Sequence, residues 1–153
     1  MSDPVMVPTE ADVEAFLDRA EPAGRREDGF VLFDMMNRAT GVEPVMWGPS
    51  IVGYGQTHYR YESGREGDMP LIGFSPRKAN LAVYGMQGPA TDHLIEALGP
   101  HKLGAGCLWL GRLTKIDLDA LERLVVAAWA HQVEISGGTG VSGDAGQVRS
   151  SGC

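Results

Sequence analysis

Aromatic and basic residues recur between positions 47 and 102 in a combination that suits a pocket for a small anion or a planar ligand. Aromatic walls exclude water, and a small number of positive groups supply charge and hydrogen bonds. The candidate ligand-binding residues are Trp47, Tyr54, His58, Tyr61, Arg65, Lys78, His101 and Lys102. No phosphate-binding glycine motif accompanies them. The alternative is that Trp47 and alternate tyrosines belong to the core, while the basic residues protect sheet edges.

Four carboxylates near the N-terminus are spaced i, i+4, i+8 and i+11; they are Glu10, Glu14, Asp18 and Glu21. At about 3.6 residues per turn they would form one exposed ridge beside the apolar stripe of a helix. Oxygen ligands suit iron and other hard cations, so this ridge is the candidate metal site. The alternative is an ordinary solvated helix face.

The four histidines form neither HxH nor HExxH, so the sequence contains no local metal motif. His58, His101 and Cys107 would form a His2Cys site if the strand that holds Cys107 lay beside the strands that precede it. The alternative is that these are ordinary residues of strands and loops, which need not lie close together.

No catalytic residue is assigned from the sequence. Ser50, Ser63 and Ser75 lack the GxSxG pattern of a nucleophile elbow. Cys107 lies in the middle of an expected strand, where cysteine usually packs as a small apolar side chain. The carboxylates of residues 62–68 border a turn open to solvent, which would not shift their pKa values as general acid catalysis requires. The sequence therefore favours a binding or accessory role over an enzyme.

Three amphipathic patterns predict the helices that would position these residues. Thr9 is expected to cap the first helix, which ends before Pro22. A second helix is expected over residues 25–39, with Gly41 as its C-cap. The last helix is expected to begin after the N-cap Asp117. Its expected buried face consists of Leu121, Leu124, Val125, Ala128 and Trp129.

Residues 51–62, 71–75 and 80–85 predict an antiparallel meander, because they are rich in valine, tyrosine and glycine and fit no helical period. The glycine-rich residues 63–67 are expected to close its first hairpin. A short helix and a fourth strand at 106–111 follow. The predicted order is ααβββαβα, an α+β fold in which an antiparallel sheet of about four strands packs with four helices.

The length of 153 residues and net charge of −7 suit one domain and argue against a dedicated nucleic-acid binder. We expect one domain over residues 1–135 and a disordered Gly/Ser-rich tail over 136–153. The acidic N-terminus does not resemble a signal peptide, and no apolar run approaches about 18 residues. A cytoplasmic protein without a nucleic-acid or membrane partner is therefore expected.

Five ordered blocks of this sequence resemble the YdhG-like domain family. They are residues 46–55 (MWGPSIVGYG), 61–68 (YESGREGD), 73–81 (GFSPRKANL) with Tyr84, 98–104 (LGPHKLG) with 107–108, and 115–119 (KIDLD). The resemblance covers about residues 8–131 and implies a frataxin-like α+β domain. One branch of the family is proposed to act as an iron chaperone, but this chain is more similar to a branch without an established activity. Where the family pattern HKxGK has a lysine, this chain has Ala105.

The expected function is that of a small YdhG-like protein with a non-enzymatic binding or accessory role. Its most concrete form is frataxin-like iron binding along the acidic ridge. The alternative is a small-anion or planar-ligand binding protein or enzyme that uses the aromatic and basic residues. A third possibility is a protein–protein interaction module. The expected partners are a small ligand or an iron-using protein, and the chain is expected to be a monomer or a homodimer.

Overall fold

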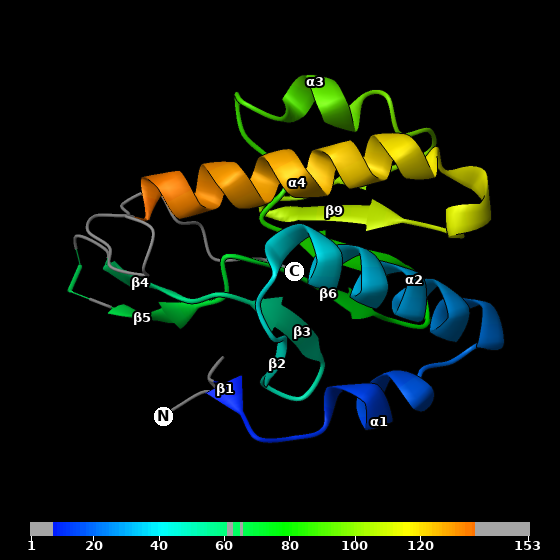
Figure 1. The fold of residues 1–153 in the computed structure, drawn as a ribbon, viewed down its shortest axis with the longest axis horizontal. Coiled ribbons are helices and arrows are strands. Elements are labelled where there is room, and N and C mark those ends of the chain that lie inside the picture. The colour runs from blue at the N-terminus through cyan, green and yellow to red at the C-terminus, as the bar shows by residue number, and fades with distance from the viewer. Residues whose placement is uncertain (1–7, 61–62, 65, 137–153) are drawn as a thin grey trace.

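The computed structural model describes residues 8–60, 63–64 and 66–136 (Figure 1). Its elements, in chain order, are β1 (Pro8–Thr9), α1 (Val13–Asp18), α2 (Ala23–Thr40), β2 (Val45–Trp47), β3 (Ile51–Tyr54), β4 (Thr57–Arg60), β5 (Glu66–Met69), β6 (Ile72–Pro76), β7 (Leu81–Tyr84), α3 (Asp92–Ile95), β8 (Lys102–Leu103), β9 (Cys107–Leu110), the 3-10 turn η1 (Leu113–Lys115) and α4 (Leu118–Ile135). The predicted α+β class is confirmed. Beyond Ser136, the predicted tail lies outside the described residues.

Seven strands form one sheet in the order β1-β2-β3-β6-β7-β9-β8, and each neighbouring pair is antiparallel. The prediction of about four strands in the order ααβββαβα is therefore wrong in its strand count. Among the strands that it missed, β1, β2 and β8 have only two or three residues. Runs that short cannot show the two-residue alternation by which strands are recognised.

The expected long strand over 51–62 is divided between β3 and β4. Gly55 follows β3 with φ 75°, a backbone conformation that costs little only for glycine. The chain then leaves the main sheet, and β4 pairs with β5 in a separate hairpin (Figure 1). It returns at Leu71, whose N–H donates to Tyr54 O at 3.1 Å. The β4–β5 hairpin is thus an excursion between two neighbouring strands of the main sheet.

The first helix is shorter than predicted. Thr9 does not cap it, because Thr9 pairs with Met46 in β1. The N-cap is Asp12, whose Oδ1 accepts a hydrogen bond from Ala15 N at 3.1 Å. After Asp18, the N–H of Arg19 donates to Phe16 O, three residues back. This is the hydrogen-bond spacing of a 3-10 turn, and it ends the α-helix. The six residues of α1 make less than two turns.

The two long helices match the prediction closely. Helix α2 includes all of residues 25–39 and ends at Gly41, which adopts φ 71° as expected for a C-cap glycine. Helix α4 begins after Asp117, whose Oδ1 accepts from Ala120 N at 3.0 Å. Most of its expected buried face is buried, namely Leu121, Leu124, Val125 and Ala128. Within the described residues, no helix is both long enough and apolar enough to cross a membrane.

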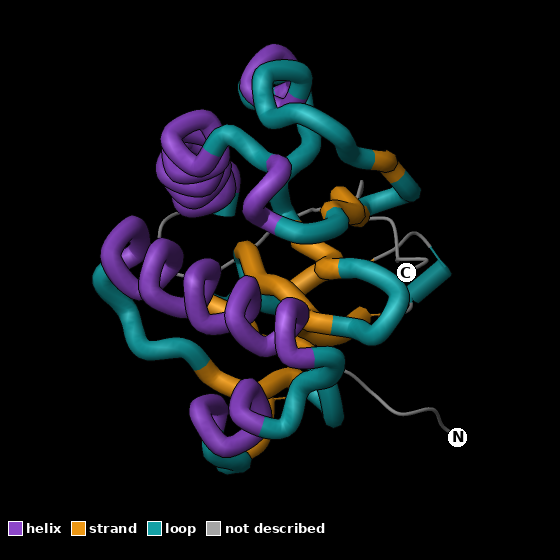
Figure 2. The backbone as a smooth tube through the Cα atoms, turned by 90° about the vertical axis from the view of Figure 1, so that its right-hand side faces the viewer, coloured by secondary structure: helices purple, strands orange, loops and turns teal. Residues whose placement is uncertain are grey.

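The main core lies between the sheet and helices α2 and α4, which run side by side over one sheet face (Figures 1 and 2). Cross-strand register aligns Val52, Phe74, Val83 and Leu108 in one row of that core. We call this side the helix face. Because side chains alternate along a strand, the neighbouring row, which includes Ser75, points to the opposite side. We call that side the outer face.

Candidate functional site

Two of the predicted ligand-binding residues are buried on opposite sides of the sheet. Trp47 pairs with Ile51, which lies three residues from Tyr54 along β3. An odd separation on a strand sends side chains to opposite faces, so Trp47 lies on the outer face and Tyr54 on the helix face. Both are nearly inaccessible to solvent, at 2% and 0% exposed. The alternative assignment of these two residues to the core describes them better than a shared pocket.

Tyr54 has a structural role between β3 and α2. Its hydroxyl oxygen lies 2.8 Å from Asn37 Oδ1 and 3.3 Å from the backbone oxygen of Phe33. Both of these oxygens can accept the hydroxyl proton, and Asn37 Oδ1 is the nearer acceptor. Burial, aided by the charge of Asp34, raises the pKa of the Tyr54 phenol well above its usual value. The phenol therefore remains a neutral hydrogen-bond donor that fastens α2 to the sheet.

His58 joins the two strands of the β4–β5 hairpin. Its Nε2 contacts Glu66 Oε1 at 2.8 Å and its Nδ1 contacts Asp68 Oδ1 at 2.9 Å. Hydrogen bonding to Glu66, and then to Asp68, raises the pKa of His58 above 6.5. The imidazole is 43% exposed, so the solvent screens both ion pairs. The predicted Tyr61 and Arg65, close to this hairpin in sequence, lie outside the described residues.

We expect these ion pairs to depend on pH. Because the pKa of His58 is raised in the folded chain, their contribution is complete below about pH 6.5 and disappears as pH rises through the folded-state pKa. Glu66→Gln should lower the pKa of His58 measured by NMR titration of its ring protons. Asp119→Asn, on α4, is the control that should leave it unchanged. An unchanged His58 pKa in the Glu66→Gln variant would contradict the assignment.

The remaining predicted residues lie in two separate places. His101 and Lys102 are at the sheet edge, where His101 Nδ1 donates to Gly99 O at 2.8 Å and Lys102 pairs with Trp109. Lys78 is exposed in the turn between β6 and β7. The structure therefore distributes the described members of the predicted set over both sheet faces, one edge and one turn.

The predicted acidic ridge is not one helical face. Glu14 and Asp18 lie on α1, whereas Glu10 precedes the helix and Glu21 follows it. The prediction extended the helical period over 12 residues, and the helix has only six. In the described ranges, no three His, Cys, Asp or Glu side chains are grouped closely enough to hold a metal ion. The grouping of His58, His101 and Cys107 is likewise not formed.

A shallow cavity of about 360 Å³ lies at the N-terminal end of α2. It is lined by Glu21, Pro22, Ala23, Arg26 and Lys78. Arg26 is held in place by its Nε, which donates to Ala20 O at 3.2 Å. The cavity thus combines two basic side chains with one carboxylate, and it includes Lys78 from the predicted ligand-binding set.

The first turn of α2 adds positive potential to this cavity. No side chain caps the helix, and its first turn contains no acidic residue. The carbonyl of Pro22 accepts from Arg25 N and Arg26 N, whereas the amides of Ala23 and Gly24 have no acceptor within the described chain. In an 18-residue helix these free amides carry the positive end of the macrodipole.

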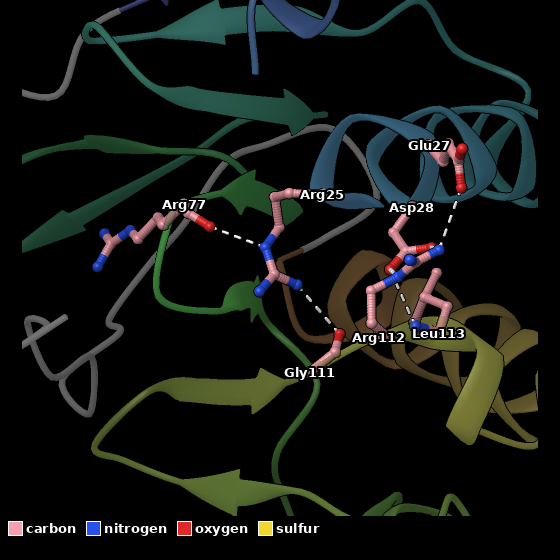
Figure 3. A network of polar contacts seen from close by, with 7 residues as sticks. All are labelled: Arg25, Glu27, Asp28, Arg77, Gly111, Arg112 and Leu113. Carbon is pink, nitrogen blue, oxygen red and sulfur yellow. Dashed lines mark hydrogen bonds and ion pairs between the residues drawn. The ribbon is translucent and has the colours of Figure 1, made fainter. Parts of the chain in front are cut away.

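Arg25, which precedes the cavity-lining Arg26 in α2, is buried and bonded to two backbone carbonyls. Its side chain is 7% exposed, with Nε donating to Arg77 O at 2.8 Å and Nη1 to Gly111 O at 3.1 Å (Figure 3). Both acceptors are neutral carbonyls, and Arg25 has no carboxylate partner within the described residues. Among the described residues, Arg25 thus differs from Arg112, which pairs with Asp28 and Glu27.

Arg25 and Arg26 were missed by the sequence interpretation, although the sequence contains a signal for them. Two consecutive arginines follow Pro22 at the start of the expected helix, and the first acid is Glu27. Helices normally carry acids in the first turn, so basic residues there oppose the macrodipole. Such a reversal marks a helix start that could accept an anion.

Comparisons of this chain with protein-family models, with curated proteins and with solved structures gave no match. The likeness of its sequence blocks to the YdhG-like family therefore stays a prediction.

Proposed function

We propose that this chain is a YdhG-like domain that binds a small anion, without catalysis, at the N-terminal end of α2. The observation that carries the proposal is the cavity of about 360 Å³ in which Arg26 and Lys78 border the start of an uncapped helix. Helix N-termini bind phosphate and carboxylate groups through free amides and the helix dipole. The five sequence blocks support the family proposal.

The charge balance around the cavity supports an anionic ligand. Arg26 and Lys78 line it, and Glu21 is the acid in its lining. Arg25, the residue before Arg26, has no carboxylate partner within the described residues. Arg112, also close to the helix start, is neutralised by its own ion pairs. A bound anion would therefore meet a net positive surface, although the whole chain has a net charge of −7.

The test is calorimetric titration of the full chain with inorganic phosphate and with acetate. We expect Lys78→Ala and Arg26→Ala each to weaken binding roughly tenfold, because a hydrogen bond to a charged group contributes about 1.5–3 kcal/mol. Lys102→Ala is the matched control, since Lys102 is an exposed lysine at the distant sheet edge. Undiminished binding by the Arg26→Ala/Lys78→Ala double variant, or no binding of either anion, would overturn the proposal.

A further inference from the structure

The α2 cavity combines acidic and basic side chains that do not pair with one another. Glu21 belongs to its lining together with Arg26 and Lys78. Within the described residues, neither basic side chain forms an ion pair with Glu21. Opposite charges that line one cavity without neutralising each other are both available to a ligand.

The Arg26 side chain is held by the segment that precedes α2. Its Nε donates to Ala20 O at 3.2 Å, and Ala20 immediately precedes Glu21 in the chain. The two terminal nitrogens of Arg26 have no acceptor in the described part of the chain. One hydrogen bond thus positions the guanidinium, while its outer N–H groups remain able to donate to an anion.

Lys78 joins the same lining from the turn between β6 and β7. The carbonyl oxygen of the preceding Arg77 accepts a 2.8 Å hydrogen bond from Arg25 Nε of α2 (Figure 3). The backbone N–H of Arg77 donates to Asn80 O at 2.9 Å, which closes the turn. These contacts fix the backbone beside Lys78 relative to the start of α2. The second positive charge of the cavity therefore comes from an element far from Arg26 in the sequence.

The rest of the lining is apolar. Pro22 and Ala23 carry no polar side-chain atom, and they lie between Glu21 and the two arginines in the sequence. The volume of about 360 Å³ is near the lower end of the range for ligand sites, about 300–1,000 Å³. The cavity therefore suits a small molecule with a short hydrocarbon part between its charged groups.

We propose that the ligand of the α2 cavity is a small zwitterion, whose anionic group binds Arg26 and Lys78 and whose ammonium group binds the Glu21 carboxylate. The inference rests on the proposed anion site, and it adds the class of ligand and the role of Glu21. A simple anion is repelled by Glu21, whereas a ligand with an ammonium group at its other end gains a favourable contact from the same carboxylate. Amino acids with a separated amine and phosphorylated amines share this chemistry.

The experiment compares two pairs of compounds in which an ammonium group takes the place of a methyl group. They are β-alanine with butyrate, and phosphoethanolamine with propyl phosphate. Binding to the full chain is followed by NMR at the amides of Ala23 and Arg26, with inorganic phosphate and acetate as reference anions. In at least one pair the zwitterion should bind about threefold more tightly, the effect of one ion pair that solvent screens. The pair with the larger preference identifies the anionic group as a carboxylate or a phosphate.

Glu21→Gln tests the assignment of the ammonium group. It should abolish the preference for the zwitterion and strengthen the binding of the simple anion about twofold, because it removes a repulsive charge. Glu134→Gln is the matched control, since Glu134 is an exposed acid in the last turn of α4, outside the cavity's lining. It changes the net charge by the same amount and should leave the preference intact.

Equal affinities within both pairs would overturn this inference, as would a preference that persists in Glu21→Gln. If phosphate or acetate still binds at the cavity in either case, the proposed anion site itself stands. If neither of these anions and none of the paired compounds shifts the Ala23 and Arg26 amides, the proposed function and this inference fail together.

Discussion

Replacing Asp28 with alanine is expected to destabilise the chain by about 3 kcal/mol. The Asp28 carboxylate is almost fully buried on α2, where it accepts from Arg112 Nε and from Leu113 N, both at 2.9 Å (Figure 3). Its loss would leave the Leu113 amide buried without an acceptor and remove the main counter-charge of Arg112. Because Arg112 is 40% exposed, water compensates part of this loss. The expected effect is therefore smaller than for a fully buried ion pair.

Urea denaturation at neutral pH measures this effect as a lower midpoint with an unchanged slope. Glu27→Ala is the matched control, because Glu27 also pairs with Arg112 but is 70% exposed. It should change the free energy of unfolding by less than about 1 kcal/mol. If Asp28→Ala lost no more stability than Glu27→Ala, the buried carboxylate would not be an important tether.

Asp28 and Arg25 together explain why the α2 cavity exists. Asp28 fixes the helix to η1, and Arg25 fixes it to the backbone of Arg77 and Gly111. The turn that contains Lys78 is thereby held against the start of α2, where Arg26 also lines the cavity. The two basic side chains that line the cavity, Arg26 and Lys78, are therefore positioned by two buried charged residues, Asp28 and Arg25, which would not contact the anion themselves.

The long helices could be predicted because a repeated apolar pattern and a capping residue agree over many residues. In α4, the N-cap Asp117 and the periodic apolar side chains from Leu121 onward predict the same helix. The start of α1 could not be predicted in the same way. Thr9 is a good N-cap by residue type, but pairing with Met46 draws it into the sheet. The local capping preference of Thr9 was overridden by its pairing with Met46, a tertiary contact between residues far apart in the sequence.

The candidate site was predictable only in part, because sheet register decides which side chains meet. Lys78 was identified among the basic residues, and it lines the cavity. Trp47 and Tyr54 were grouped together because they are close in sequence and aromatic. Their separation depends on the pairing of Trp47 with Ile51, and the strand that contains Trp47 has only three residues. The helix that begins near Arg25 was predicted, but the capacity of its first turn to accept an anion was missed, because that capacity appears only when the helix dipole is considered.

Gly85→Ala is expected to destabilise the chain by about 3 kcal/mol, through two effects that add. Gly85 has φ 84°, which costs about 1–2 kcal/mol for a residue with a side chain. A Cβ at this position would also overlap the carbonyl oxygen of Leu71, a backbone atom that cannot rotate away. The strand end that bears Tyr84 would therefore have to move, and Gln132 Nε2 would lose its 3.2 Å contact with Gly85 O.

Gly41→Ala separates these two effects. Gly41 has a similar φ of 71°, but an added Cβ would meet no atom within 4 Å. It should therefore cost only about 1 kcal/mol, the conformational part alone. The difference between the two variants in the free energy of unfolding, measured by urea denaturation, gives the cost of the clash with Leu71 O. Equal losses of stability would show that the end of β7 can move away from Leu71 at no measurable cost.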